Sequence, residues 1–137
     1  PKALVLDERL VDKLELIVAE LRARGHRGAR LRVMSGFRTP MLAPGRLRSR
    51  RTPDSRHQHG DAADIIVDAD GDHRMDDLTW DGRLDLRDTR ALIDVIKFVE
   101  EQHPALVGGI GMYRNPGISG PFVHVDARGE SVRWGLP

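Results

Sequence analysis

The chain contains 137 residues, of which 22 are basic and 21 are acidic, with 6 histidines and no cysteine. This length predicts one domain spanning residues 1–137, and the near-neutral charge argues against a nucleic-acid binder, whose phosphate contacts need a surplus of lysine and arginine. Because cysteine is absent, disulfides and thiolate nucleophiles are excluded, and any metal ligands must be His, Asp or Glu.

No apolar run reaches the roughly 18 residues that a membrane-spanning helix needs, so we expect no membrane insertion in this chain. The sequence starts at Pro1 without the basic and then apolar segments of an export signal. We expect the domain to be a monomer.

The first predicted element is a helix from Asp7 to Arg24, with Asp7 as its N-cap. A short strand containing Leu31 and Val33 follows, and it places Arg38 just beyond its end. A guanidinium in that position can hold a carboxylate through two parallel hydrogen bonds. The helix has apolar residues at helical spacing, as expected for a helix that covers a sheet: Leu10, Leu14, Ile17, Val18 and Leu21.

The stretch from Asp54 to Asp70 combines two histidines and several aspartates with an apolar run, Ala62 to Val67, that predicts a buried strand. Burial of a carboxylate such as Asp64 within this strand is costly unless a cation or hydrogen-bond donors meet it. A metal ion would meet this need, and His57 lies seven residues upstream to share it.

The segment that follows, from Asp68 to Asp72, is similar to the first half of a calcium-binding loop. The match is incomplete, because His73 occupies the position where the loop needs glycine, and Thr79 occupies the position of its bidentate glutamate. We interpret the segment as a solvated acidic turn, with calcium binding as the alternative.

A second helix is predicted from Asp88 to Gln102, with Asp88 as its cap. The next strand, from Leu106 to Tyr113, is rich in glycine, which is typical of a place where another backbone or a ligand comes close. The last strand, from Pro121 to Asp126, places His124 and Asp126 on one face. These elements predict an α+β fold: a small, mainly antiparallel sheet carrying the site, with two main helices packed around it.

A catalytic zinc ion usually has three protein ligands and one open position for water, and His57, Asp64 and His124 supply that number. Bound zinc lowers the pKa of its water to about 7 and polarises a scissile carbonyl. Sequence spacing does not show that the two strands are neighbours, so the fold must bring these side chains together.

Three motifs of the chain resemble those of a known family: Ser55-x-His57-x-x-Gly60-x-Ala62-x-Asp64, Ser35-Gly-Phe-Arg38-Thr-Pro40 and His124-Val-Asp126. They are similar to the motifs of the zinc D-alanyl-D-alanine carboxypeptidase and murein endopeptidase family, which is related to lysostaphin-type peptidases and the hedgehog signalling domain. The resemblance implies one catalytic zinc ion held by His57, Asp64 and His124. It also implies that Arg38 contacts the substrate and stabilises the transition state, and that Ser55 and Tyr113 line the cleft.

The general base is the point at which the chain departs from many relatives, which have an acidic residue where this chain has Pro121. A branch of the family with a Phe-Val-His-Val-Asp ending lacks that acid too. Asp126 is one candidate for the base, but the same carboxylate could instead orient a metal-bound imidazole. His59 is a candidate proton carrier or oxyanion partner.

The resemblance implies hydrolysis of a peptide bond in bacterial peptidoglycan stem peptides or cross-links, by a D,D-carboxypeptidase or murein endopeptidase in the periplasm or outside the cell. One alternative is a metal-bearing cell-wall binding module that does not hydrolyse its target, which the missing acid at Pro121 favours. Another is a phage- or bacteriocin-type lysin with the same chemistry.

Overall fold

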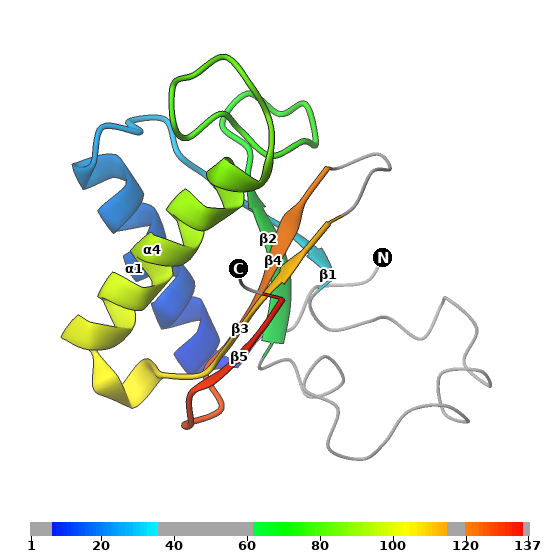
Figure 1. The fold of residues 1–137 in the computed structure, drawn as a ribbon. Helices are drawn as coiled ribbons and strands as arrows, with labels where there is room; N and C mark the ends of the chain where they lie inside the picture. Colours follow the sequence, from blue (N-terminus) through cyan, green and yellow to red (C-terminus); the bar gives the residue numbers. More distant parts are fainter. Residues whose placement is uncertain (1–6, 36–61, 115–119, 136–137) are drawn as a thin grey trace, which may run out of the picture.

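The computed structural model describes residues 7–35, 62–114 and 120–135 of the chain (Figure 1). The predicted α+β class is confirmed. The described helices are α1 (Glu8–Ala23), α4 (Leu86–Gln102) and a short 3-10 helix (Pro104–Leu106). The described strands are β1 (Leu31–Ser35), β2 (Ala62–Val67), β3 (Gly109–Tyr113), β4 (Phe122–Asp126) and β5 (Val132–Trp134).

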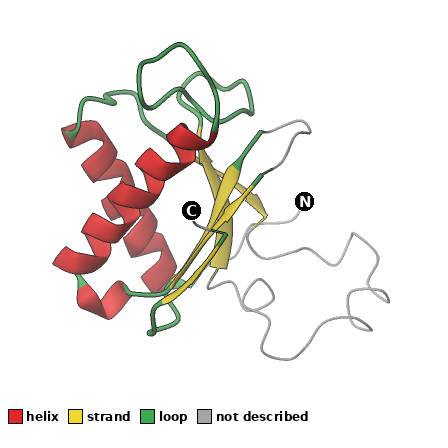
Figure 2. Ribbon diagram, in the orientation of Figure 1, coloured by secondary structure: helices red, strands yellow, loops and turns green. Residues whose placement is uncertain are grey.

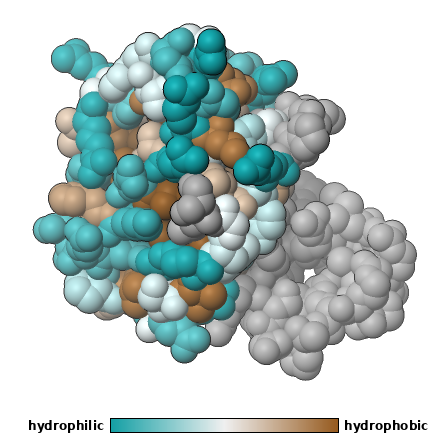
Figure 3. All heavy atoms as spheres, in the orientation of Figure 1, coloured by the Kyte–Doolittle hydropathy of each residue, from teal (hydrophilic) through white to brown (hydrophobic). Residues whose placement is uncertain are grey.

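The five described strands form one sheet in the order β1-β2-β4-β3-β5. All neighbouring pairs are antiparallel except β3 and β5, which are parallel, so the sheet is mainly antiparallel as predicted. Helices α1 and α4 lie together on one side of the sheet (Figure 2). Hydrophilic side chains cover much of the helical layer in the view of Figure 3. Within the described ranges, no helix is both long and apolar enough to cross a bilayer.

Alternation along β4 divides the sheet into two chemically different faces. Val123 and Val125 are fully buried and belong to the same apolar core as residues of both helices. His124 and Asp126 occupy the alternate positions and lie on the opposite face, as the sequence predicts. The core is built mainly from aliphatic side chains, including Leu10, Ile17, Ile65, Leu92, Ile96 and Ile110.

The cap of α1 was predicted correctly and the cap of α4 was not. Asp7 accepts a hydrogen bond from the backbone N–H of Arg9, as an N-cap does. Helix α4 begins at Leu86 with Asp85 as its N-cap, so the prediction that Asp88 caps it is wrong. Asp88 instead completes a capping box, in which its Oδ2 accepts from the N–H of Asp85 at 2.8 Å.

Two strand predictions also need correction. The strand predicted from Leu106 begins at Gly109, because Pro104–Leu106 form the short 3-10 helix. The strand ending at Asp126 is not the last, because β5 follows it and pairs with β3. The three residues of β5 are too few to show an alternation of apolar and polar side chains that sequence analysis could detect.

The acidic turn after β2 is anchored by a buried aspartate. Asp68 accepts hydrogen bonds from Arg32 Nε at 2.8 Å and from the backbone N–H groups of Asp72 and His73, both at 3.0 Å. His73 has a φ of 66°, in the left-handed region that favours glycine. The interpretation of this turn as simply solvated is therefore wrong for Asp68, although Asp70 and its neighbours are exposed.

We predict that Asp68→Asn reduces the acid sensitivity of the fold. Burial raises the pKa of Asp68, but hydrogen bonds from Arg32 and from backbone N–H groups outweigh it and lower the pKa to about 2. A depressed pKa stabilises the folded state above the unfolded value, and that stabilisation is lost as the pH falls through about 4 to about 2. Unfolding in denaturant at several pH values should show a shallower loss of stability for the variant.

The matched control for this measurement is Asp94→Asn, which changes an exposed aspartate on α4. It should keep the wild-type pH dependence. Equal slopes for wild type and Asp68→Asn would show that Asp68 does not carry the effect.

Candidate metal centre on neighbouring strands

The fold brings two of the predicted metal ligands together. Asp64 in β2 and His124 in β4 are direct partners in the antiparallel register, so their side chains lie side by side on one face. Asp64 Oδ1 lies 3.3 Å from His124 Nδ1. The third predicted ligand, His57, lies outside the described residues, as do Arg38, Ser55 and His59.

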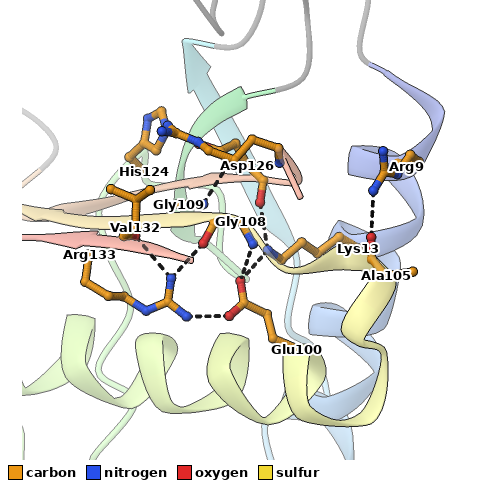
Figure 4. Close-up of polar contacts among 11 residues, drawn as sticks. Arg9, Lys13, Glu100, Ala105, Gly108, Gly109, His124, Asp126, Val132 and Arg133 are labelled. Atoms are coloured by element: carbon orange, nitrogen blue, oxygen red, sulfur yellow. Dashed lines mark hydrogen bonds and ion pairs between the residues drawn. The ribbon is translucent and has the colours of Figure 1, made fainter. Parts of the chain in front are cut away.

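The second ring nitrogen of His124 faces Asp126. The distance from His124 Nε2 to Asp126 Oδ2 is 3.0 Å, and Figure 4 shows the two side chains next to each other. Because Asp126 contacts Nε2 and Asp64 contacts Nδ1, the imidazole is held at both nitrogens. A cation bound to His124 Nδ1 and Asp64 would therefore not be bound by Asp126, which lies at the other nitrogen of the ring.

The Asp126 carboxylate is fully buried and heavily hydrogen-bonded. Its Oδ1 accepts from the backbone N–H of Gly109 at 2.7 Å and from the N–H of Arg128 at 3.1 Å. The Arg128 guanidinium also reaches both oxygens, with its Nη2 2.7 Å from Oδ2. This set of donors satisfies a buried charge that would otherwise be costly.

These contacts shift the pKa values in opposite directions. Burial raises the pKa of Asp126, but hydrogen bonds from His124 and Arg128 outweigh it and hold the pKa well below its ordinary value. Burial lowers the pKa of His124, but hydrogen bonds with Asp126 and Asp64 outweigh it and raise the pKa. The surroundings of the imidazole thus favour added positive charge, which a proton or a metal ion can supply.

An indole ring lies beside the imidazole because β3 has a glycine at the point of contact. Gly111 pairs with His124 on one side and with Trp134 on the other. A Cβ atom at Gly111 would lie only 2.2 Å from Trp134 Cε2. The Trp134 and His124 rings are 4.9 Å apart at their centroids. The sequence predicts that another backbone or a ligand comes close to the glycines of this strand. At Gly111 the group that comes close is the Trp134 side chain.

Tyr113, the predicted cleft residue at the end of β3, extends the aromatic surface beside His124. Its hydroxyl oxygen accepts a hydrogen bond from Trp134 Nε1 at 2.6 Å, and its ring stacks on Phe122 with centroids 5.1 Å apart. Tyr113 is 38% exposed, so part of this ring is open to a ligand.

Sequence analysis missed Arg128 and Trp134. Arg128 continues the alternation of His124 and Asp126 by two residues, which is a signal that it lies on the same side. Trp134 carries no such signal, because its contact with His124 arises only when β5 pairs with β3.

Two further groups of aspartates could hold a metal ion through oxygen ligands, the type that calcium and magnesium prefer. Neither group contains Asp64 or His124, so neither is the predicted zinc site. The first comprises Asp68, Asp70, Asp72 and Asp76, and the second comprises Asp77, Asp81 and Asp88.

We predict that Gly111→Ala displaces the Trp134 indole and destabilises the domain by roughly 1–3 kcal/mol, the range for overpacking. The Cβ atom and the indole cannot occupy the same space. Tryptophan fluorescence in a Trp80→Phe background would report the movement of Trp134, and denaturant unfolding would report stability. Gly28→Ala is the control, because its Cβ would meet only Ala69 Cβ at 3.8 Å. Unchanged fluorescence of Trp134 in Gly111→Ala would contradict the described packing.

Three comparisons with known proteins were made, against family models, curated proteins and solved structures. No protein-family model, curated protein or solved structure matches the chain. The function of the site must therefore be inferred from its residues and their geometry.

Proposed function

We propose that the chain is a zinc-dependent peptidase domain in which Asp64, His124 and His57 hold one metal ion. The observation that carries this proposal is the distance of 3.3 Å between Asp64 Oδ1 and His124 Nδ1. Two ligand atoms bound at about 2.0–2.1 Å to a tetrahedral zinc ion lie roughly 3.3 Å apart. The two described ligands thus fit zinc in donor type and in spacing.

The partner of His124 Nε2 supports the same assignment. A metal-binding histidine commonly donates its second N–H to a carboxylate, which fixes the tautomer and the orientation of the ring. With the proton on Nε2 and directed at Asp126, the lone pair of His124 is on Nδ1, next to Asp64. In this tautomer the imidazole presents a lone pair to a cation shared with Asp64.

Asp126 then orients His124 and is not the general base. An efficient general base has a pKa near the working pH and reaches the solvent or the substrate. Asp126 has a strongly lowered pKa, is 0% exposed and has both oxygens occupied by donors. His59 is the remaining predicted proton carrier, and Arg38 the remaining predicted oxyanion partner.

Zinc, when bound, supplies a Lewis acid and a water molecule of lowered pKa. The chain supplies the surroundings of that ion. The Trp134 ring in β5 lies against the His124 ring in β4. Tyr113 in β3 presents a partly exposed ring. Arg128 favours the ionised form of Asp126 and donates to both of its oxygens, including the Oδ2 that meets His124.

The substrate class in this proposal comes from the motif resemblance, which implies peptidoglycan stem peptides or cross-links as substrate and a periplasmic or extracellular location. Carboxypeptidase and endopeptidase activities both fit the site. A phage- or bacteriocin-type lysin would use the same residues on foreign cell walls.

A second candidate function is metal-dependent binding of the cell wall without hydrolysis. It is favoured by the burial of Asp126 together with Pro121 three residues before His124, because these leave no candidate base among the described residues of the centre. Such a module would retain purified sacculi in a chelator-sensitive manner and release no fragments.

We predict that the wild-type domain binds one zinc ion and releases peptide fragments from purified sacculi, and that His124→Ala abolishes both. Loss of the imidazole removes a ligand from a buried strand position. Metal analysis and chromatography of released fragments would measure the two effects. His103→Ala, which changes an exposed histidine after α4, should leave them intact. Normal digestion by His124→Ala would refute the ligand assignment.

We predict that Asp126→Asn weakens zinc binding by about 10- to 100-fold, as expected for loss of a carboxylate that orients a ligand. The amide can present an NH₂ group to Nε2 and thereby favour the wrong tautomer. Zinc competition with a chelator would measure affinity, and turnover at saturating zinc would measure catalysis. Unchanged zinc affinity with a large fall in turnover would instead identify Asp126 as the base.

A further inference from the structure

A buried lysine connects helix α1 to the back of the candidate metal centre. The side chain of Lys13 is 0% exposed, although lysine is rarely buried. Its Nζ donates to Glu100 Oε2 at 2.7 Å and to the main-chain oxygen of Asp126, also at 2.7 Å (Figure 4). Asp126 is therefore held from two directions, through its carbonyl by Lys13 and through its carboxylate at the site.

Glu100 extends the same network to the start of β3. Its Oε2 accepts from the backbone N–H of Gly108 at 3.0 Å, and its Oε1 accepts from Arg133 Nη2 at 2.5 Å. Arg133 Nη1 in turn donates to the main-chain oxygen of Gly108 at 2.6 Å. Both polar groups of the Gly108 backbone are thus fixed by charged side chains from α4 and β5.

The Gly108 backbone is adjacent to Gly109, which contacts the Asp126 carboxylate that orients His124. The residue after Gly108 is Gly109, whose N–H donates to Asp126 Oδ1. A Cβ atom at Gly108 would lie 2.1 Å from the main-chain oxygen of Asp126, so the two segments are in close contact. The Gly109 N–H, together with the N–H and Nε of Arg128, therefore helps to fix the direction of the carboxylate that Asp126 presents to His124.

Stability alone does not account for this network. Charged groups lose their hydration when buried, and replacement of a buried ion cluster by apolar residues of similar size is often neutral or stabilising. Lys13 lies among the buried helix residues Leu10, Leu14 and Ile17, where an apolar side chain would simply extend the core. The ionic groups are explained by the main-chain atoms that they hold in place.

We propose that Lys13, Glu100 and Arg133 are positioning residues for the metal centre. They hold the Gly108–Gly109 backbone and the Asp126 carbonyl so that Asp126 presents Oδ2 to His124 Nε2. The role of this arrangement in metal binding rests on the proposed function, whereas its effect on the His124 tautomer does not.

The test compares Glu100→Gln with Glu101→Gln, and Lys13→Met with Lys97→Met. Glu101 and Lys97 are exposed on α4, so each control makes the same chemical change away from the network. Long-range ¹H–¹⁵N NMR of the metal-free protein, at alkaline pH where the imidazole is neutral, reports which nitrogen of His124 carries the proton. Competition with a chelator then gives the zinc dissociation constant.

We expect the Nε2–H tautomer to dominate in the wild type and in both controls. Glu100→Gln and Lys13→Met should give a mixture of tautomers and bind zinc about tenfold more weakly, the lower end of the range for changes around a metal ligand. Circular dichroism would show that the variants remain folded. Lys13→Met leaves Glu100 paired with Arg133, so it provides the test if Glu100→Gln does not fold.

The positioning role is overturned if a folded Glu100→Gln or Lys13→Met variant keeps the wild-type tautomer of His124. This outcome is distinct from failure of the proposed function. A wild-type domain that bound no zinc would refute the metal centre, yet the tautomer comparison between variants and controls would still decide the positioning role.

Discussion

One buried carboxylate joins the sheet, the helices and the candidate metal centre. Asp126 accepts hydrogen bonds from Gly109, Arg128 and His124 through its side chain, and from Lys13 through its main-chain oxygen. A buried charge is tolerated only where donors satisfy it, so each of these groups is constrained by the others. The orientation of His124 is therefore a property of the whole domain.

The alternation of β4 allows one strand to serve the core and the site together. Val123 and Val125 anchor the strand in the aliphatic core, while His124 and Asp126 face the other way. Functional side chains on a well-packed strand are held more rigidly than side chains on a loop, which suits a metal site with fixed ligand spacing. The cross-strand register then places Asp64 beside His124 without help from any loop.

Local patterns predicted those parts of the structure that local interactions determine. The helix after Asp7 and the two faces of β4 followed from hydrophobic spacing, and the placement of Asp64 in a strand followed from its apolar neighbours. The start of α4 was misplaced because Asp85 and Asp88 are both acceptable caps, and only the capping box distinguishes their roles. The role of Lys13 could not be predicted from the sequence, because its burial depends on an ion pair with Glu100, which is distant in sequence. The contact of Trp134 with His124 likewise depends on a non-local strand pair.

The order of elements along the chain has a consequence for biosynthesis. Asp64 and His124 are neighbours in the sheet, but the acidic turn, α4 and β3 separate them in sequence. A ribosome therefore releases β2 well before β4, and an unfinished polypeptide carries the carboxylate without the imidazole. Closing so long a loop has an entropic cost that is offset only when the strands pair and the core forms. A chain that ends before β4 therefore cannot form the cross-strand pair of Asp64 and His124.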